Sequence, residues 1–376
     1  MRSFCLLAAF CLLLALARPA PATPFFARAY GFSCQTCHSG YPRLNPFGLA
    51  FKANNFRVPG AEKAAVMAWQ KTPPLATQIE PTYQRFSPGR RKSQYTDTQL
   101  LAGGLLSRTT AFYIHHSLWI DDKPTEFPSY EVWAQQVLDE HSKLMFKIGQ
   151  FELPYAYSPF INMATVFQPQ IYLASLQDND VEIGTTMRGI QLSGLINHRV
   201  QFYLAYGAPA INTSGFAVGQ REFLGEFRDF YMRFANRDQA RNLGFFVYLT
   251  HPPRDPADLS TSDRGQRYGL DGRFDWRGFQ FYAMAVYGEN SDPLGNGKRG
   301  FLRGGFIEVD KMFLPWLGLA VRLEAQTTNI GTTRTYSDAK TISLSLYPIR
   351  NLKLTAEYQQ RDHGRSDTAL QASLSF

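Results

Sequence analysis

The sequence predicts a mainly β protein, an antiparallel β-barrel of about 16 strands preceded by a small N-terminal module. From Leu75 to Phe376, apolar and polar residues alternate with a period of two, which is typical of strands with one apolar and one wet face. The connections between these segments are short and long in turn, as in barrels that cross a membrane. Before Leu75 the composition differs, and this part holds the motif CQTCH at residues 34–38.

The first 22 residues are typical of an export signal. Arg2 supplies a positive start, residues 4–17 are apolar, and Ala20 and Ala22 provide small residues for cleavage, so the mature chain is expected to begin near Thr23. A lipoprotein anchor does not fit, because the bulky Phe10 precedes Cys11. The predicted organisation is therefore a signal peptide at 1–22, a module at 23–74 and a barrel at 75–376.

Composition excludes several classes of protein. The net charge is +8, but the basic residues are scattered along the chain, so we expect no nucleic-acid partner. After the signal no run of 18 apolar residues occurs, so no transmembrane helix is predicted. An aromatic content of 14% suits the aromatic girdles of a membrane barrel. No nucleophilic triad or phosphate-binding loop indicates a hydrolase or a transferase.

The barrel strands are predicted from alternation. In LKLTAEY at 352–358, leucine, alanine and tyrosine share one face, and Lys353, Thr355 and Glu357 share the other. Full charges in mid-strand do not suit the packed inner face of a soluble sandwich, but they fit a barrel with a wet interior. The predicted strands are 75–86, 94–107, 109–120, 129–138, 142–150, 184–194, 198–206, 228–235, 241–250, 266–275, 278–288, 300–310, 316–327, 339–348, 351–360 and 367–376.

The lengths of the connections predict the orientation. Short ones are expected at 107–108, 139–141, 195–197, 276–277 and 348–350, and long ones at 121–128, 151–183, 207–227, 251–265, 289–299 and 328–338. Outer-membrane barrels have short periplasmic turns and longer outer loops, so both chain ends and the N-terminal module are expected on the periplasmic side. The final segment, ALQASLSF, ends in Phe376 and resembles the C-terminal signal of barrels assembled into the bacterial outer membrane.

The motif at 34–38 predicts one covalently attached c-type haem. In C-x-x-C-H, the thiols of Cys34 and Cys37 can add to the haem vinyl groups, and His38 can bind the iron from the proximal side. A thioredoxin-like pair would need a βαβ unit around it, and a zinc site would need further Cys or His ligands. A disulfide across two residues would constrain little. Covalent attachment also explains how so small a module could hold a haem.

The motif leaves the distal iron ligand open. Met67 is one candidate, because GAEKAAVMAWQK before Pro73 predicts a short helix in the same module. His115 is the other candidate, because alternation in AFYIHHSLWI turns it toward the lumen, where the module could meet it. Ordinary packing of Met67, and ordinary hydrogen bonding of His115, are the alternative interpretations.

The sequence resembles the fused monohaem cytochrome–porin family, whose best-known members are outer-membrane ferrous-iron oxidases. The resemblance rests on FFARAYGFSCQTCH, then YPRLNPFGLAFKANNF, and then a single porin-like barrel. It implies that Cys34 and Cys37 carry the haem and that His38 is the proximal ligand. It also implies that the haem pocket is shaped by Pro42, Leu44, Phe47, Gly48, Phe51 and Lys52. Leu49 departs from the family, whose iron oxidases tend to have arginine there.

The leading hypothesis is an outer-membrane electron-transfer protein. An extracellular donor, with Fe(II) as the first candidate, would reduce the haem, and a periplasmic cytochrome would accept the electron, as in an Fe(II):cytochrome c oxidoreductase. Because the apolar band of such barrels is about 25 Å tall, the haem must lie inside the barrel or the donor must enter it. Two alternatives are a diffusion porin plugged by a haem module and a reductase of an extracellular acceptor. The sequence does not give the direction of electron flow, which depends on axial ligands, hydrogen bonds and burial.

Overall fold

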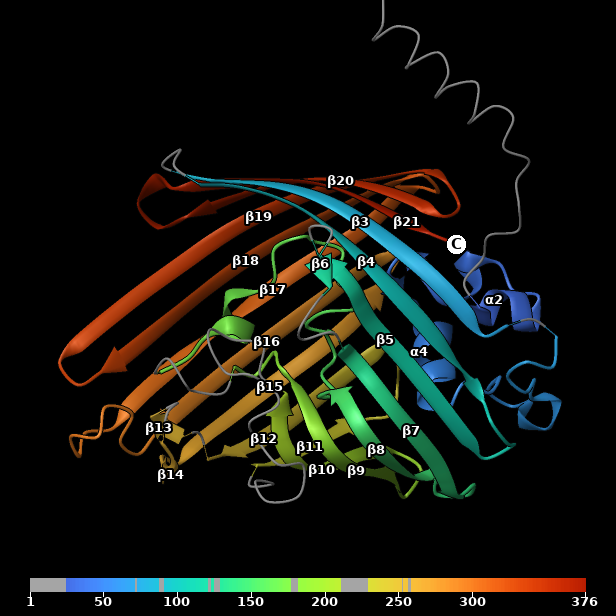
Figure 1. The fold of residues 1–376 in the computed structure, drawn as a ribbon, viewed down its shortest axis with the longest axis horizontal. Coiled ribbons are helices and arrows are strands. Elements are labelled where there is room, and N and C mark those ends of the chain that lie inside the picture. Colours follow the sequence, from blue (N-terminus) through green and yellow to red (C-terminus); the bar gives the residue numbers. More distant parts are fainter. Residues whose placement is uncertain are drawn as a thin grey trace, which may run out of the picture.

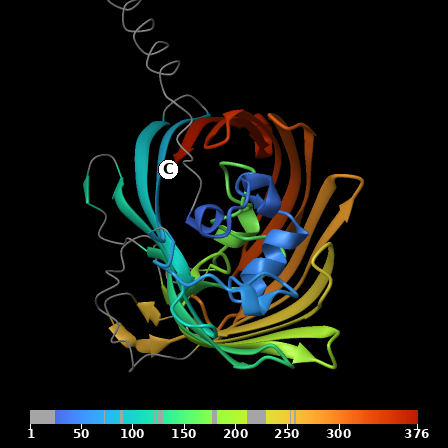
Figure 2. The same cartoon turned by 90° about the vertical axis from the view of Figure 1, so that its right-hand side faces the viewer.

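The protein was analysed as a computed structural model that describes residues 25–71, 73–87, 91–120, 123–124, 129–176, 182–210, 229–251, 253–255 and 258–376. The predicted signal peptide at 1–22 lies outside these residues. A closed antiparallel barrel forms the body of the molecule, and the N-terminal segment lies in one of its mouths (Figures 1 and 2). None of the described helices is long and apolar enough to cross a membrane.

Sixteen strands close the barrel, and this confirms the predicted fold class. The last strand pairs with the first, so that Leu370 lies opposite Tyr83. The strands are β3 (Leu75–Phe86), β4 (Arg91–Leu105), β5 (Thr110–Ile120), β7 (Ser129–Asp139), β8 (Leu144–Glu152), β9 (Thr186–Ile196), β10 (Val200–Ala210), β11 (Asp229–Asn236), β12 (Arg241–Thr250), β15 (Gly265–Trp276), β16 (Phe279–Asn290), β17 (Gly300–Leu314), β18 (Leu317–Ile330), β19 (Thr333–Ile349), β20 (Leu352–Arg361) and β21 (Ser366–Ser375). Three short strands, β6 (Lys123–Pro124), β13 (Pro253–Asp255) and β14 (Asp258–Ser262), accompany them.

The two faces of the strands have the predicted polarity. In β18, Val321 and Leu323 are exposed on the outer surface, whereas Arg322 and Glu324 between them are buried. In β20, Lys353 and Glu357 are likewise buried. A soluble protein would place these residues the other way round, whereas a barrel in lipid needs an apolar outside and can pair its charges within.

One segment that was predicted to be a loop instead continues two strands. The segment 328–338 was expected to be a long connection, but β18 and β19 stay paired to Ile330 and Thr333. Gly331, with a φ of 62°, makes the tight turn between them. The pattern in this segment is hidden because both faces carry threonine and other polar residues near the water-exposed end.

The N-terminal segment, residues 25–74, is called the plug. It contains α2 (Phe25–Tyr30), α3 (Cys34–Cys37), β1 (His38–Gly40), β2 (Arg43–Leu44), α4 (Pro46–Ala53) and the single turn η1 (Glu62–Ala64). Figure 2 shows its helices inside the ring of strands. The plug lies at the end with the short turns, because Arg57 pairs with Glu140 and Asn55 donates to the carbonyl of Thr109, both of which are turn residues.

The prediction of a short helix around Met67 is wrong. After η1 the chain runs alongside the end of β4, where Met67 forms a bridge with Leu105 and the N–H of Ala68 donates to the Leu105 carbonyl over 2.7 Å. The alanine-rich composition favours a helix only weakly, and the hydrogen bond to the open end of a barrel strand outweighs that preference.

A second segment fills the lumen. The connection from β8 to β9, whose described parts are 153–176 and 182–185, was expected among the outer loops, but it folds back into the barrel and includes the turn η2 (Gln170–Leu173). The backbone N–H groups of Val166 and Phe167 donate to the Glu357 carboxylate, over 2.6 and 2.9 Å. This connection is called the inner loop. Lumen carboxylates hold it by satisfying backbone donors that would otherwise be buried without partners.

Candidate functional site

The cysteines and the histidine of the motif lie together on the plug. Cys34 and Cys37 occupy one turn of α3, three residues apart, so their side chains project from the same side of the helix. Both thiols are free and half-buried. Burial raises the pKa of the Cys34 thiol, and burial together with the nearby Cys34 raises the pKa of Cys37 to about 11. A reactive redox pair has a lowered thiol pKa, so this environment does not favour thiol exchange.

Local packing fixes the short helix against α4. Asn45 caps α4 by accepting a hydrogen bond from the N–H of Gly48 over 2.9 Å, and its Nδ2 donates to the carbonyls of Gln35 and Thr36. A Cβ at Gly48 would lie only 2.2 Å from the carbonyl oxygen of Cys37. Glycine at this position therefore allows the close contact between the two helices.

His38 is oriented for a ligand. Its Nδ1 lies 3.1 Å from the carbonyl oxygen of Pro42, and this hydrogen bond needs the proton on Nδ1. The Nε2 lone pair is then available to a metal, in the arrangement commonly found for metal-binding histidines. Burial lowers the pKa of the imidazole, which favours the neutral form that can act as a ligand.

A largely aromatic pocket surrounds the motif. Besides Cys34, Cys37 and His38, it is lined by Phe25, Phe26, Phe32, Phe51 and Phe56 of the plug and by Tyr113 and Tyr347 of the barrel. Pro42, Leu44, Gly48 and Lys52, which the family resemblance assigned to a haem pocket, also line it. Phe47 is not among the lining residues but stacks on Phe51, with ring centroids 6.3 Å apart. Ile161 and Asn162 of the inner loop complete the wall.

These residues fit a covalently attached haem. The two thiols can form the covalent bonds to the haem, and the available Nε2 of the adjacent imidazole can bind its iron. The aromatic wall can bury its apolar ring. Lys52, Arg350 and Lys353 are the cations along the pocket and match the negative charge of haem propionates. The fit involves both the plug and the barrel.

Neither distal candidate lines this pocket. Met67 is held at the edge of β4, where its N–H donates to Gln70 Oε1. His115 is buried on β5 and faces the lumen as predicted, with its Nε2 2.7 Å from Gln99 Oε1, but it lines a different cavity. Their proposed role as distal ligand stays a prediction.

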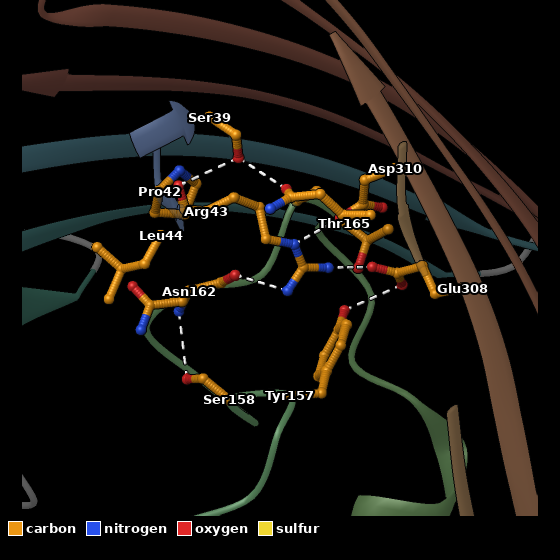
Figure 3. Close-up of polar contacts among 12 residues, drawn as sticks. Ser39, Pro42, Arg43, Leu44, Tyr157, Ser158, Asn162, Thr165, Glu308 and Asp310 are labelled. Carbon is orange, nitrogen blue, oxygen red and sulfur yellow. Dashed lines mark hydrogen bonds and ion pairs between the residues drawn. The ribbon is translucent and has the colours of Figure 1, made fainter. Parts of the chain in front are cut away.

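Arg43 anchors the plug in the barrel and was not singled out from the sequence (Figure 3). Its side chain is 4% exposed and pairs with Glu308 and with Asp310, the latter over 2.5 Å, both on β17. Its Nη1 donates to the carbonyl of Asn162 on the inner loop over 2.7 Å. The guanidinium also lies over the ring of Tyr157, 4.2 Å from the centroid. One side chain thus joins the plug, the inner loop and the barrel wall.

Weaker contacts surround this anchor. Ser39 Oγ donates to Gln280 Oε1 over 2.7 Å, Tyr347 Oη donates to the carbonyl of Tyr41 over 2.8 Å, and Arg273 Nη1 donates to the carbonyl of Leu44 over 2.8 Å. The only sequence feature that could have pointed to Arg43 was the pair of carboxylates in mid-strand of β17, which needed a cation inside the barrel.

A second cavity, of about 570 Å³, connects the outer end of the lumen with the plug. It is lined near the outer strand ends by Ser93 and Ile120, and at its inner end by Tyr41 and Pro42, the residue whose carbonyl orients His38. The share of one water molecule in liquid is about 30 Å³, so a hydrated ion fits. This space is called the vestibule.

Two carboxylates and a histidine face the vestibule. Gln99 Nε2 donates to Glu80 Oε2 over 3.1 Å and to Asp97 Oδ2 over 2.6 Å, and His115 lies beside them. Nowhere in the described part of the chain do three or more His, Cys, Asp or Glu side chains converge as a metal site.

No protein-family model and no curated protein matches this chain. Solved structures do resemble it. The anion-selective porin from Comamonas acidovorans aligns with a TM-score of 0.60 and 8% identity, over 80% of this chain and 99% of the porin. A loop L8 deletion mutant of Vibrio cholerae OmpT gives 0.59 and 8%, over 80% and 98%. OmpF of Salmonella typhi, in complex with daunomycin, gives 0.57 and 10%, over 80% and 97%.

At this low identity the resemblance shows the fold, which is that of outer-membrane porins and channels. The apolar outer surface and the closed ladder of hydrogen bonds independently require a lipid environment. The protein is thus an outer-membrane β-barrel of a bacterium, with its plug at the short-turn, periplasmic end.

Proposed function

We propose that this protein transfers electrons across the outer membrane through one covalent c-type haem, from an extracellular donor to a periplasmic cytochrome. Fe(II) is the first candidate for the donor, which would make the protein an Fe(II):cytochrome c oxidoreductase. The observation that carries the proposal is the C-x-x-C-H motif at an aromatic pocket between the plug and the barrel. When bound, the haem supplies a one-electron carrier at that place.

The residues of the chain have distinct roles in this proposal. Cys34 and Cys37 would hold the haem, and His38, aligned by the carbonyl of Pro42, would supply Nε2 to the iron. Arg43 would keep the plug seated in the barrel.

The vestibule supports entry of a small donor. An apolar band of about 25 Å would separate an outside donor from a carrier at the periplasmic mouth. The vestibule reaches Tyr41 and Pro42, next to the haem motif, and so shortens that separation for an ion that enters the barrel. Glu80 and Asp97 along it are oxygen donors of the type that suits divalent metal ions in passage.

The direct test is stopped-flow absorbance of the oxidised, haem-loaded protein mixed with Fe(II). We expect rapid, saturable haem reduction, and a slower rate in the variant Glu80→Gln, which removes one vestibule charge. Thr82→Ala, on the same vestibule wall but uncharged in either form, is the matched control and should leave the rate unchanged. Protein that dithionite reduces but Fe(II) does not would rule out Fe(II) as the donor.

A diffusion porin with a plug is the second candidate, favoured by the porins and channels among the similar structures. The porin and the electron-transfer protein are expected to differ in ion conductance. The inner loop and the plug both occupy the lumen, so for an electron-transfer protein we expect no sustained open conductance of the intact chain in planar bilayers. Steady porin-like conductance of the intact, haem-loaded chain would favour the porin. The third candidate, a reductase of an extracellular acceptor, would be indicated by reoxidation of the reduced haem when that acceptor is added.

A further inference from the structure

The short-turn end of the barrel carries a ring of exposed arginines. Five of the turns between barrel strands at this end each present one. They are Arg108, Arg199, Arg237, Arg277 and Arg350, and all are exposed. This set is called the arginine rim.

The carboxylates of the same end are already engaged. Glu140 pairs with Arg57, Glu62 pairs with Lys143 over 3.3 Å, and Asp139 and Asp238 accept hydrogen bonds from the backbone of their own turns. No carboxylate among the described residues forms an ion pair with an arginine of the rim. Glu140 and Glu62 are balanced by their cations, and the five arginines of the rim outnumber Asp139 and Asp238, so the net charge of this end is positive.

The positive charge continues across the mouth of the barrel. Lys63 and Lys71 of the plug are also exposed, and Lys63 follows Glu62, which pairs with Lys143 in a short turn of the same end. Arg350 lines the pocket that holds Cys34, and its charge acts on the Cys34 thiol. Lipid headgroups could reach only the outer edge of such a surface, whereas a protein seated over the mouth could contact all of it.

We propose that the arginine rim is the docking surface for a soluble periplasmic redox protein with an acidic face, which exchanges electrons at the pocket mouth beside Arg350. The redox exchange rests on the proposed function, whereas the binding itself does not. Complementary charge would steer the encounter and raise the association rate, with a strong dependence on salt.

Two acceptors of opposite charge test this proposal: plastocyanin, which is acidic, and mitochondrial cytochrome c, which is basic. The full-length, haem-loaded protein in zwitterionic nanodiscs is first reduced with dithionite, so the result does not depend on Fe(II). It is then mixed with each oxidised acceptor in a stopped-flow instrument at low and high salt. We expect plastocyanin to react at least tenfold faster at low salt than at high salt, and cytochrome c to show the opposite dependence or none.

The variant Arg199→Glu/Arg237→Glu/Arg277→Glu, which leaves the pocket residue Arg350 intact, should slow the low-salt reaction with plastocyanin by about tenfold or more. The matched control is Arg334→Glu/Arg365→Glu, which changes exposed arginines at the opposite end of the barrel and should leave the rate unchanged. Unchanged haem spectra and electrophoretic mobility of the folded barrel would show that each variant is assembled.

Equal rates for both acceptors at every salt concentration would overturn the proposal, as would a wild-type rate in the triple variant. Loss of binding to phosphatidylglycerol vesicles in the triple variant, with unchanged reaction with plastocyanin, would assign the rim to lipid and likewise overturn it. Equilibrium binding of plastocyanin is measured in parallel. Salt-sensitive binding without electron exchange would uphold the docking surface and contradict the proposed electron transfer, so the two can fail separately.

Discussion

At the scale of single residues, Arg43 and His38 show how the plug combines seating with the candidate chemistry. His38 lies five residues before Arg43, and the intervening Pro42 carbonyl aligns its ring. Arg43 forms an ion pair with the barrel wall and donates a hydrogen bond to the inner loop. The position of the haem motif in the lumen therefore depends on a buried ion pair whose carboxylates lie far from the motif in the sequence.

Replacing Arg43 should unseat the plug. Arg43→Ala removes a cation from Glu308 and Asp310 in a buried place, a change that costs about 3–5 kcal/mol in other proteins. Protease sensitivity of the plug, measured in intact vesicles, should therefore rise sharply. Ser39→Ala, which removes one neutral hydrogen bond of about 1 kcal/mol, is the control. Equal protection of both variants would contradict the anchoring role.

A pH dependence is expected at Glu62. Burial acts to raise the pKa of this carboxyl, but hydrogen bonds from the backbone, Asn54 and Lys143 outweigh it and lower the pKa to about 2. A lowered carboxyl pKa means that its stabilising contribution is present above about pH 4.5 and is lost as the pH falls toward 2. The contact of Glu62 with Lys143 should weaken in that window.

Hydrogen exchange of the segment 54–66 can measure this loss. The difference in protection between the wild-type protein and the variant Glu62→Gln should be greatest above pH 4.5. It should vanish near pH 2, because protonated glutamate and glutamine are both neutral. A constant difference over the whole range would contradict the assignment.

At the scale of elements, the plug and the inner loop enter the lumen from opposite ends and meet at the candidate site. Ile161 and Asn162 of the inner loop lie against the same pocket as α3 and α4 of the plug. Aromatic stacking ties the plug to the wall, as in the pair Phe56 and Trp133, whose ring centroids are 5.6 Å apart. The pocket therefore exists only when these parts are assembled.

Packing between α3 and α4 should limit haem attachment. In Gly48→Ala, the added methyl would meet the carbonyl of Cys37 at 2.2 Å, so α4 must move away from the motif. We expect a lower yield of haem-bearing protein at an equal amount of folded barrel, measured as the ratio of haem absorbance to protein. Leu49→Ala, the next position of α4, removes side-chain volume without adding a clash and should retain more haem.

At the scale of the whole molecule, the fold reverses the arrangement of a soluble protein. Apolar residues cover the outside, and ion pairs such as Arg322 with Glu308 and Glu324 fill the inside. These internal charges also fix the inner loop, since Arg322 donates to Thr165 and to the Phe167 carbonyl. The outer surface determines membrane insertion, and the inner surface determines how far the lumen is closed.

The outer surface of β18 provides a test of depth in the membrane. Leu323→Arg, in mid-strand, should destabilise the barrel by about 2–4 kcal/mol, and Leu317→Arg, on the same face at the short-turn end, by about 0–1 kcal/mol. Reversible unfolding in lipid vesicles measures both. A larger loss at Leu317 than at Leu323 would contradict the proposed placement of the strand.

The sequence alone determined the barrel, the approximate number of its strands, its orientation and the site motif, because these depend on local patterns: alternation along a strand, the length of a turn and the spacing of Cys34, Cys37 and His38. Only the tertiary structure decided that residues 153–176 turn inward, that Arg43 meets Glu308, and that Met67 pairs with the end of β4 in place of forming a helix. Those outcomes depend on which distant polar groups find partners inside the barrel. No periodicity in the chain encodes that information, because each partner satisfies a hydrogen bond or a charge of a residue far away in the sequence.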